Sequence, residues 1–80
     1  MEINFKYNIG DIVYFCLDYL HIYKAKVYER YVTYKEVNNN KATVSILYTV
    51  LFHEDGELRY MCLPEESLHK TPDGLSLELE

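Results

Sequence analysis

The sequence predicts one small, mostly-β domain, and three observations lead to that prediction. The chain has 80 residues, which is room for a single domain spanning residues 1–80. Apolar and polar residues alternate over much of residues 12–63, the period-two pattern of half-buried strands. Asp55-Gly56 separates two such segments, and Asp-Gly is the strongest short-range signal for a β-hairpin.

Three segments are predicted as strands directly from residue type. Residues 12–17 are almost all β-branched, aromatic or aliphatic, and they follow a turn signal at Gly10-Asp11. Residues 42–52 alternate cleanly, and residues 58–63 return after the Asp-Gly turn until Pro64, which cannot donate to a ladder. One side of the 42–52 strand is expected to hold Val44, Ile46, Tyr48, Val50 and Phe52, and the other Thr43, Ser45, Leu47, Thr49 and Leu51.

Residues 20–37 fit two patterns. Leu20, Tyr23, Val27, Tyr31 and Tyr34 would form an apolar stripe on a helix. The segment is nevertheless rich in Tyr, Val and Thr, which lose side-chain freedom in helices and suit pleated surfaces. We therefore favour strand, either one long bent strand or two, with the helix as the open alternative.

The remaining segments are predicted as turns and short elements. Turns are expected at Asp18-Tyr19 and, most clearly, at Asn38-Asn39-Asn40-Lys41. Residues 64–67 suit a single helical turn with carboxylates at its start, and residues 68–70 suit a last short strand. Thr71-Pro72 is typical of a helix start, and the final Leu79-Glu80 is typical of a pair left by an expression vector.

This order of elements resembles the small uncharacterised SH3-like barrel proteins of bacteria and their phages. The resemblance covers about residues 9–75. It is carried by Gly10-Asp11-Ile12-Val13-Tyr14, Lys24-Ala25-Lys26-Val27, Pro64-Glu65-Glu66-Ser67-Leu68 and Thr71-Pro72. It implies a five-stranded SH3-like open barrel with one short helical turn near the C-terminus. The family has no defined activity, so the resemblance transfers no functional residues.

Charge and composition restrict the classes of partner. The net charge is −5, with +1 on residues 1–53 (six Lys and Arg, five Asp and Glu) and −6 on residues 54–80 (two and eight). An acidic chain repels nucleic-acid phosphates. Neither a secretory signal nor an apolar run long enough for a membrane span is present, so we expect a cytoplasmic protein. Cys16 and Cys62 are therefore expected as thiols.

Cations and tyrosines are concentrated on residues 23–34, and this segment is the predicted binding site. On a regular strand Lys24, Lys26, Tyr28 and Arg30 would share one face. Cations between aromatic rings suit phosphate neutralisation and base stacking, but lysines also protect an edge strand from aggregation. The candidate binding residues are Tyr23, Lys24, Lys26, Tyr28, Arg30, Tyr31 and Tyr34.

The sequence gives little support for metal binding or catalysis. Cys16, His21, His53 and Cys62 could supply zinc ligands, but their spacings match no common site. No phosphate loop, nucleophile elbow or His-Glu-x-x-His motif is present, so we expect neither an enzyme nor a cofactor. Nine tyrosines are many for so small a core, and exposed aromatic clusters mark protein-binding surfaces.

The favoured function is therefore a binding or assembly module that acts on another protein or on a second copy of itself. The alternative is a nucleic-acid-binding barrel that uses the basic strand face. Salt separates the two, because phosphate binding weakens steeply as salt rises and apolar association does not.

Overall fold

The computed structural model describes residues 3–17, 21–37 and 41–72. They form one open antiparallel sheet in which sequential strands are neighbours, in the order β1-β2-β3-β4. The elements are β1 (Ile12–Cys16), β2 (Ile22–Val37), β3 (Lys41–Glu54), β4 (Glu57–Pro64) and the 3-10 turn η1 (Glu65–Ser67). The mostly-β prediction is confirmed. Within the described ranges, no helix has the length and apolar character needed to cross a membrane.

The ambiguous segment is a single strand, β2, which spans 16 residues, and the helix alternative is wrong. Its β-branched and aromatic side chains pack on a pleated surface, as their residue types favour. It pairs with β1 through Ile22–Lys26 and with β3 as far as Val37.

The Asp-Gly turn is confirmed and sets the register of β3 against β4. Asp55 and Gly56 both have positive φ, 53° and 82°, as a two-residue type I′ hairpin requires. Glu54 and Glu57 therefore face each other, and the pairing continues to Leu47 opposite Pro64.

A β-bulge between Val27 and Glu29 interrupts the pairing of β2 with β3. A bulge places one extra residue in one strand, so the side chains beyond it exchange faces. Before the bulge Val27 lies opposite Val50, and after it Arg30 lies opposite Tyr48, which is on the same face of β3 as Val50.

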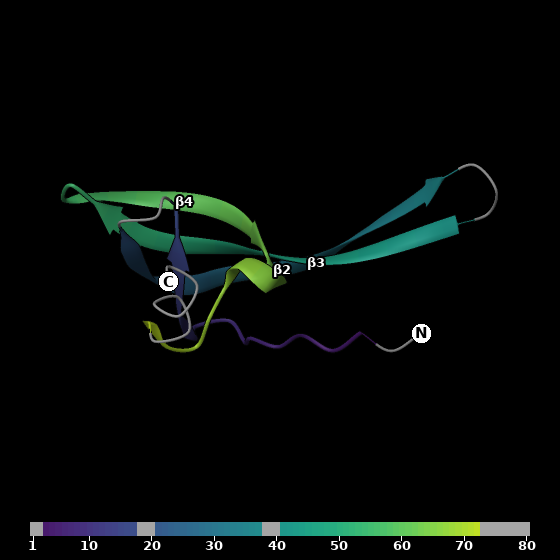
Figure 1. Ribbon diagram of the computed structural model, residues 1–80, viewed down its shortest axis with the longest axis horizontal. Helices are drawn as coiled ribbons and strands as arrows, with labels where there is room; N and C mark the ends of the chain where they lie inside the picture. The colour runs from purple at the N-terminus through teal and green to yellow at the C-terminus, as the bar shows by residue number, and fades with distance from the viewer. Residues whose placement is uncertain (1–2, 18–20, 38–40, 73–80) are drawn as a thin grey trace.

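Beyond the bulge, the long hairpin extends past its neighbours. β4 pairs with β3 only up to Leu47, and β1 pairs with β2 only up to Lys26. Residues 32–37 of β2 and 41–46 of β3 therefore form a two-stranded ribbon, which we call the distal arm (Figure 1). The arm accounts for the elongated shape, with extents of 45 × 28 × 20 Å.

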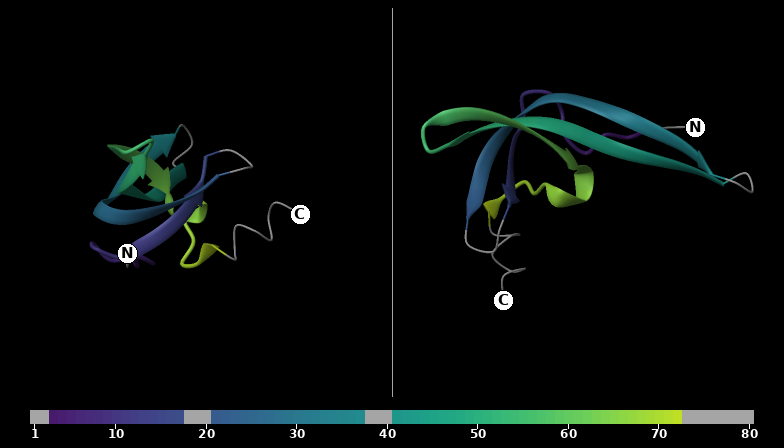
Figure 2. Two further views of the ribbon diagram at one scale, coloured as in Figure 1. Left: turned by 90° about the vertical axis from the view of Figure 1, so that its left-hand side faces the viewer. Right: turned by 90° about the horizontal axis from the view of Figure 1, so that it is seen from above.

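The core lies on one face of the sheet, which we call the inner face. The expected apolar side of β3 is the buried side, since Tyr48, Val50 and Phe52 are buried there. The segments 3–11, before β1, and 65–72, after β4, run across this face (Figures 1 and 2), and each contributes a buried residue, Tyr7 and Leu68. The buried cluster consists of Tyr7, Val13, Phe15, Ala25, Val27, Tyr48, Val50, Phe52 and Leu68.

Hydrogen bonds join the segment before β1 and the segment after β4 to the sheet and to each other. The Tyr48 hydroxyl donates to Glu65 Oε2 at 2.5 Å and accepts from the Tyr7 amide at 3.2 Å. The Tyr7 hydroxyl donates to the Leu68 carbonyl at 2.8 Å, and the Lys6 amide donates to Glu65 Oε2 at 2.9 Å. Burial, and secondly the nearby Glu65 carboxylate, raise the pKa values of Tyr7 and Tyr48 above the ordinary tyrosine value.

The expected fifth strand is not confirmed. Residues 68–70 provide a single bridge, in which the amides and carbonyls of Tyr14 and His69 exchange hydrogen bonds of 2.8 and 2.9 Å. The chain bends at Lys70 and Thr71, just before Pro72, which has no N–H to donate. Among the described residues the sheet is therefore open and four-stranded. The single helical turn predicted after Pro64 is present as the 3-10 turn η1. The predicted turn at Asp18-Tyr19 and residues 38–40 of the asparagine turn lie outside the described residues, whereas Lys41 belongs to β3. Of the helix predicted after Thr71, Pro72 is described and helical, and the rest lies outside the described residues.

Candidate binding surface on the outer face of the sheet

A row of four side chains crosses the face of the sheet opposite the core, which we call the outer face. Ile12 of β1 lies opposite Lys26, Lys26 lies opposite Leu51, and Leu51 lies opposite Tyr60 of β4. Directly opposed residues of antiparallel strands project to the same face, about 5 Å apart. The row is therefore continuous across all four strands.

Further apolar side chains extend this row along the strands. Leu58 is exposed two residues from Tyr60, on the same face of β4. Tyr28, at the bulge, contacts the Tyr60 ring edge-on, with centroids 5.8 Å apart. Tyr60 is 61% exposed and Tyr28 53%, so both rings remain accessible. We call this set the outer patch: Ile12, Tyr28, Leu51, Leu58 and Tyr60.

A shallow depression of about 310 Å³ lies within this surface. Its lining includes the apolar side chains of Ile12, Leu51 and Leu58. Lys24 and Lys26 also line it. A partner's apolar side chain could be desolvated against the aliphatic part of the depression, while the ammonium groups remain available to anions. The arrangement is that of a recognition surface, and its specificity would come from the two lysines.

The expectation that Arg30 shares a face with Lys24 and Lys26 is wrong. The bulge sends Arg30 to the inner face, where its guanidinium lies 4.6 Å from the centre of the Phe5 ring. Arg30 Nη1 also donates to the Tyr7 carbonyl at 3.1 Å and to Asn8 Oδ1 at 3.0 Å. Arg30 thus attaches the N-terminal segment to the sheet.

The other predicted tyrosines are distributed over both faces. Tyr23 is on the inner face, where its ring stacks on Phe15 with centroids 5.5 Å apart. Tyr34 is on the inner face of the distal arm, where its hydroxyl donates to Glu36 at 3.1 Å. Tyr31 is on the outer face, and its hydroxyl contacts the Cys62 sulfur, which raises the pKa of Tyr31. Of the seven predicted residues, only Lys24, Lys26 and Tyr28 therefore lie at the outer patch.

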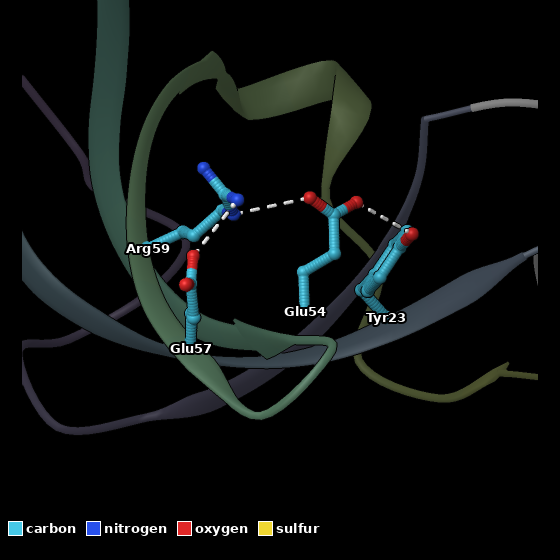
Figure 3. Close-up of polar contacts among 4 residues, drawn as sticks. All are labelled: Tyr23, Glu54, Glu57 and Arg59. Atoms are coloured by element: carbon cyan, nitrogen blue, oxygen red, sulfur yellow. Dashed lines mark hydrogen bonds and ion pairs between the residues drawn. The ribbon is translucent and has the colours of Figure 1, made fainter.

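A polar cluster at the Asp-Gly end of the sheet includes the Tyr23 hydroxyl (Figure 3). Glu54 Oε2 accepts a hydrogen bond of 3.0 Å from the Tyr23 hydroxyl, and Glu54 Oε1 pairs with Arg59 at 3.1 Å. Arg59 also pairs with Glu57 at 3.1 Å. One arginine is thus shared by two of the carboxylates that make residues 54–80 acidic. Ion pairs this exposed contribute at most about 1 kcal/mol each.

The prediction missed most of the outer patch, namely Ile12, Leu51, Leu58 and Tyr60. A signal was present for three of them, because a two-residue turn at Asp55-Gly56 places Leu51 opposite Tyr60 and puts Leu58 on their side. The weight given to cations and tyrosines in one segment obscured this cross-strand relation.

The structure also places the residues considered for metal binding. In the described ranges, no three His, Cys, Asp or Glu side chains are close enough together to hold a metal ion. Cys16 and Cys62 form no disulfide.

Comparison of the chain with protein-family models, with curated proteins and with solved structures finds no match. The surface itself is therefore the basis for a functional proposal.

Proposed function

We propose that this chain is a small protein-binding module that docks a partner protein on the outer patch. The observation that carries the proposal is the row from Ile12 to Tyr60, which gathers apolar side chains from strands of one sheet on the face away from the core. The core is complete without them, since its members lie on the inner face. Apolar surface grouped in this way is typical of interaction sites.

The chemistry of the surface indicates the kind of partner. Lys24 and Lys26 flank the depression, and both are exposed. A partner with an apolar side chain for the depression and carboxylates beside it would match both features. This arrangement suits a protein surface better than nucleic acid, because Arg30 is directed to the inner face and the net charge is −5.

We further propose that the domain is an SH3-like open barrel. The supporting features are a four-strand meander, a 3-10 turn after its last strand, and a following segment that bridges back to β1 at Tyr14. Slow amide exchange at His69 and Tyr14, measured by NMR, is the expected result. Exchange at the rate of an unstructured peptide at both amides would remove the link between the ends of the sheet.

Site-specific photocrosslinking in the native host tests the docking proposal. A benzophenone amino acid replaces Tyr60 in one variant and Tyr34 in a control, where the tyrosine is equally exposed but lies on the other face. From position 60 we expect a discrete adduct with a protein other than this chain, lost on Leu51→Asp, and we expect no adduct with that protein from position 34. No protein adduct from position 60, or the same adduct from both positions, would contradict the proposal.

A salt titration tests the alternative directly. Labelled single-stranded DNA and RNA are titrated with the purified chain at low and at physiological salt. We expect no saturable binding. Binding that weakens steeply with salt and is lost on Lys24→Glu would assign the surface to nucleic acid instead.

A further inference from the structure

We infer that the outer edge of β2 beyond the bulge, with which no described segment pairs, pairs with the same edge of a second copy of this chain. This inference concerns a different surface from the outer patch and does not depend on it. Three features support it: an edge that none of the described strands adjoins, the direction of its backbone groups, and the positions of its charges.

The edge lacks a neighbour because the sheet narrows at the bulge. β1 pairs with β2 as far as Lys26. The Gly10 amide then donates to the Val27 carbonyl, and the Val27 amide donates to the Asp11 carbonyl, each at 2.9 Å. From Glu29 outward, no described segment pairs with this edge. A two-stranded ribbon alone in water is marginally stable, and a bare edge is a template for another strand.

The register shows which backbone groups point outward. Glu54 and Glu57 flank a two-residue turn and so exchange hydrogen bonds, and such pairs alternate along an antiparallel ladder. Even-numbered residues of β3 therefore direct their backbone groups to β4, and odd-numbered ones to β2. Since Tyr31 lies opposite Leu47, odd-numbered residues of β2 beyond the bulge point to β3. The residues whose backbone groups point outward, away from β3, are Arg30, Val32, Tyr34 and Glu36.

These positions restrict how two copies can pair about a two-fold axis. Hydrogen-bonded pairs must join one even-numbered residue to another, so a register centred on Val32 opposite the partner's Val32 is permitted. In that register Glu29 faces the partner's Lys35, and the partner's Glu29 faces Lys35. Both residues are exposed on the outer face. They occupy non-hydrogen-bonded positions, where opposed side chains approach most closely.

Charge complementarity thus favours a second copy as the occupant. Edge charges of one sign would repel another copy in every register, whereas here the two signs match in a register that the backbone allows. Moving the axis by one residue would set Arg30 against the partner's Glu36. The Arg30 guanidinium, however, is already held by the Tyr7 carbonyl and Asn8. We therefore assign the Val32-centred register.

A charge-swap series followed by sedimentation velocity tests the inference. The wild-type chain is expected to dimerise as its concentration rises to the high micromolar range. Glu29→Lys and Lys35→Glu should each weaken the dimer at least about tenfold, because two attractions become repulsions. The double variant should restore it. Within one chain the two residues are about 20 Å apart along the strand, so restoration requires a second copy.

A matched control separates this edge from the outer patch. Lys24→Glu makes the same charge change beside the outer patch and should leave the dimer unchanged. A wild-type monomer at all concentrations, unaltered association of both single variants, or a double variant as weak as the singles would overturn the inference.

Amide exchange of the wild-type chain gives a second test that needs no variant. At low concentration the Val32 and Tyr34 amides should exchange quickly, and the Thr33 and Lys35 amides slowly. At high concentration Val32 and Tyr34 should become protected as well. A dimer that leaves the Val32 amide unprotected would use another surface and would contradict the assignment.

Discussion

Two halves of one sheet differ in how much of the chain covers them. Tyr48 and Tyr34 both lie on the inner face, yet Tyr48 is fully buried and Tyr34 is 59% exposed. Around Tyr48 the sheet is widened by β4, and Tyr7 and Glu65 contact its hydroxyl. Around Tyr34 the described part of the sheet consists of β2 and β3. Strand alternation therefore decides the face of a side chain, but burial depends on which other segments reach it.

The largest expected effect separates these two tyrosines. Tyr48→Ala should lower the free energy of unfolding by about 3–5 kcal/mol, because it removes a buried aromatic ring from the core. Tyr34→Ala should cost less than about 1 kcal/mol, the range of an exposed cross-strand contact. Urea denaturation followed by circular dichroism measures both. Equal losses would mean that the arm is covered as well as the core.

The Tyr48 hydroxyl has an expected contribution of its own. Tyr48→Phe keeps the ring but leaves the Tyr7 amide and Glu65 without this partner. We expect a loss of about 1–3 kcal/mol in unfolding free energy, the cost of leaving buried polar groups unsatisfied. Tyr34→Phe, which removes only a surface hydrogen bond to Glu36, is the matched control and should change stability by less than about 0.5 kcal/mol.

The Asp-Gly turn sets the register of the covered half, and its glycine is the next test. Gly56 has φ +82°, and a Cβ there would meet no atom within 4 Å, so its replacement is penalised by backbone conformation alone. Gly56→Ala should cost about 1 kcal/mol. Thermal unfolding checks this value. An unchanged midpoint would show that the turn is not the tight hairpin described here.

The smallest effect at neutral pH is the ionisation of the buried tyrosines. The pKa values of Tyr7 and Tyr48 are raised above 10.0 in the folded chain. Below pH 10 both states keep the phenol protons, so these groups leave stability unchanged. As pH rises through 10, the unfolded chain loses protons that the folded chain retains, and the free energy of unfolding falls. Chemical denaturation at several alkaline pH values, with Tyr7→Phe for comparison, should show a shallower decline in the variant. An identical decline would exclude this role for Tyr7.

Much of the fold was predictable because local chemistry specifies it. The strand types, the Asp-Gly turn, the buried side of β3 and the 3-10 turn after Pro64 follow from residue type and alternation. The bulge was not predictable, since Val27-Tyr28-Glu29 contains no glycine and fits an unbroken strand equally well. A bulge is decided by how β2 pairs with β3, which is a non-local property. The predicted basic face therefore included Arg30, and the outer patch was overlooked.

The central claim is that the bulge at Tyr28 exchanges the faces of β2, leaving Lys26 outside and Arg30 inside. Nuclear Overhauser contacts of the Arg30 side chain test it most directly. Contacts from Arg30 to the Phe5 ring, together with contacts from Glu29 to Thr49, are the expected result. Contacts from Arg30 to Leu47 or Thr49 on the outer face would show an unbroken alternation and would contradict the account.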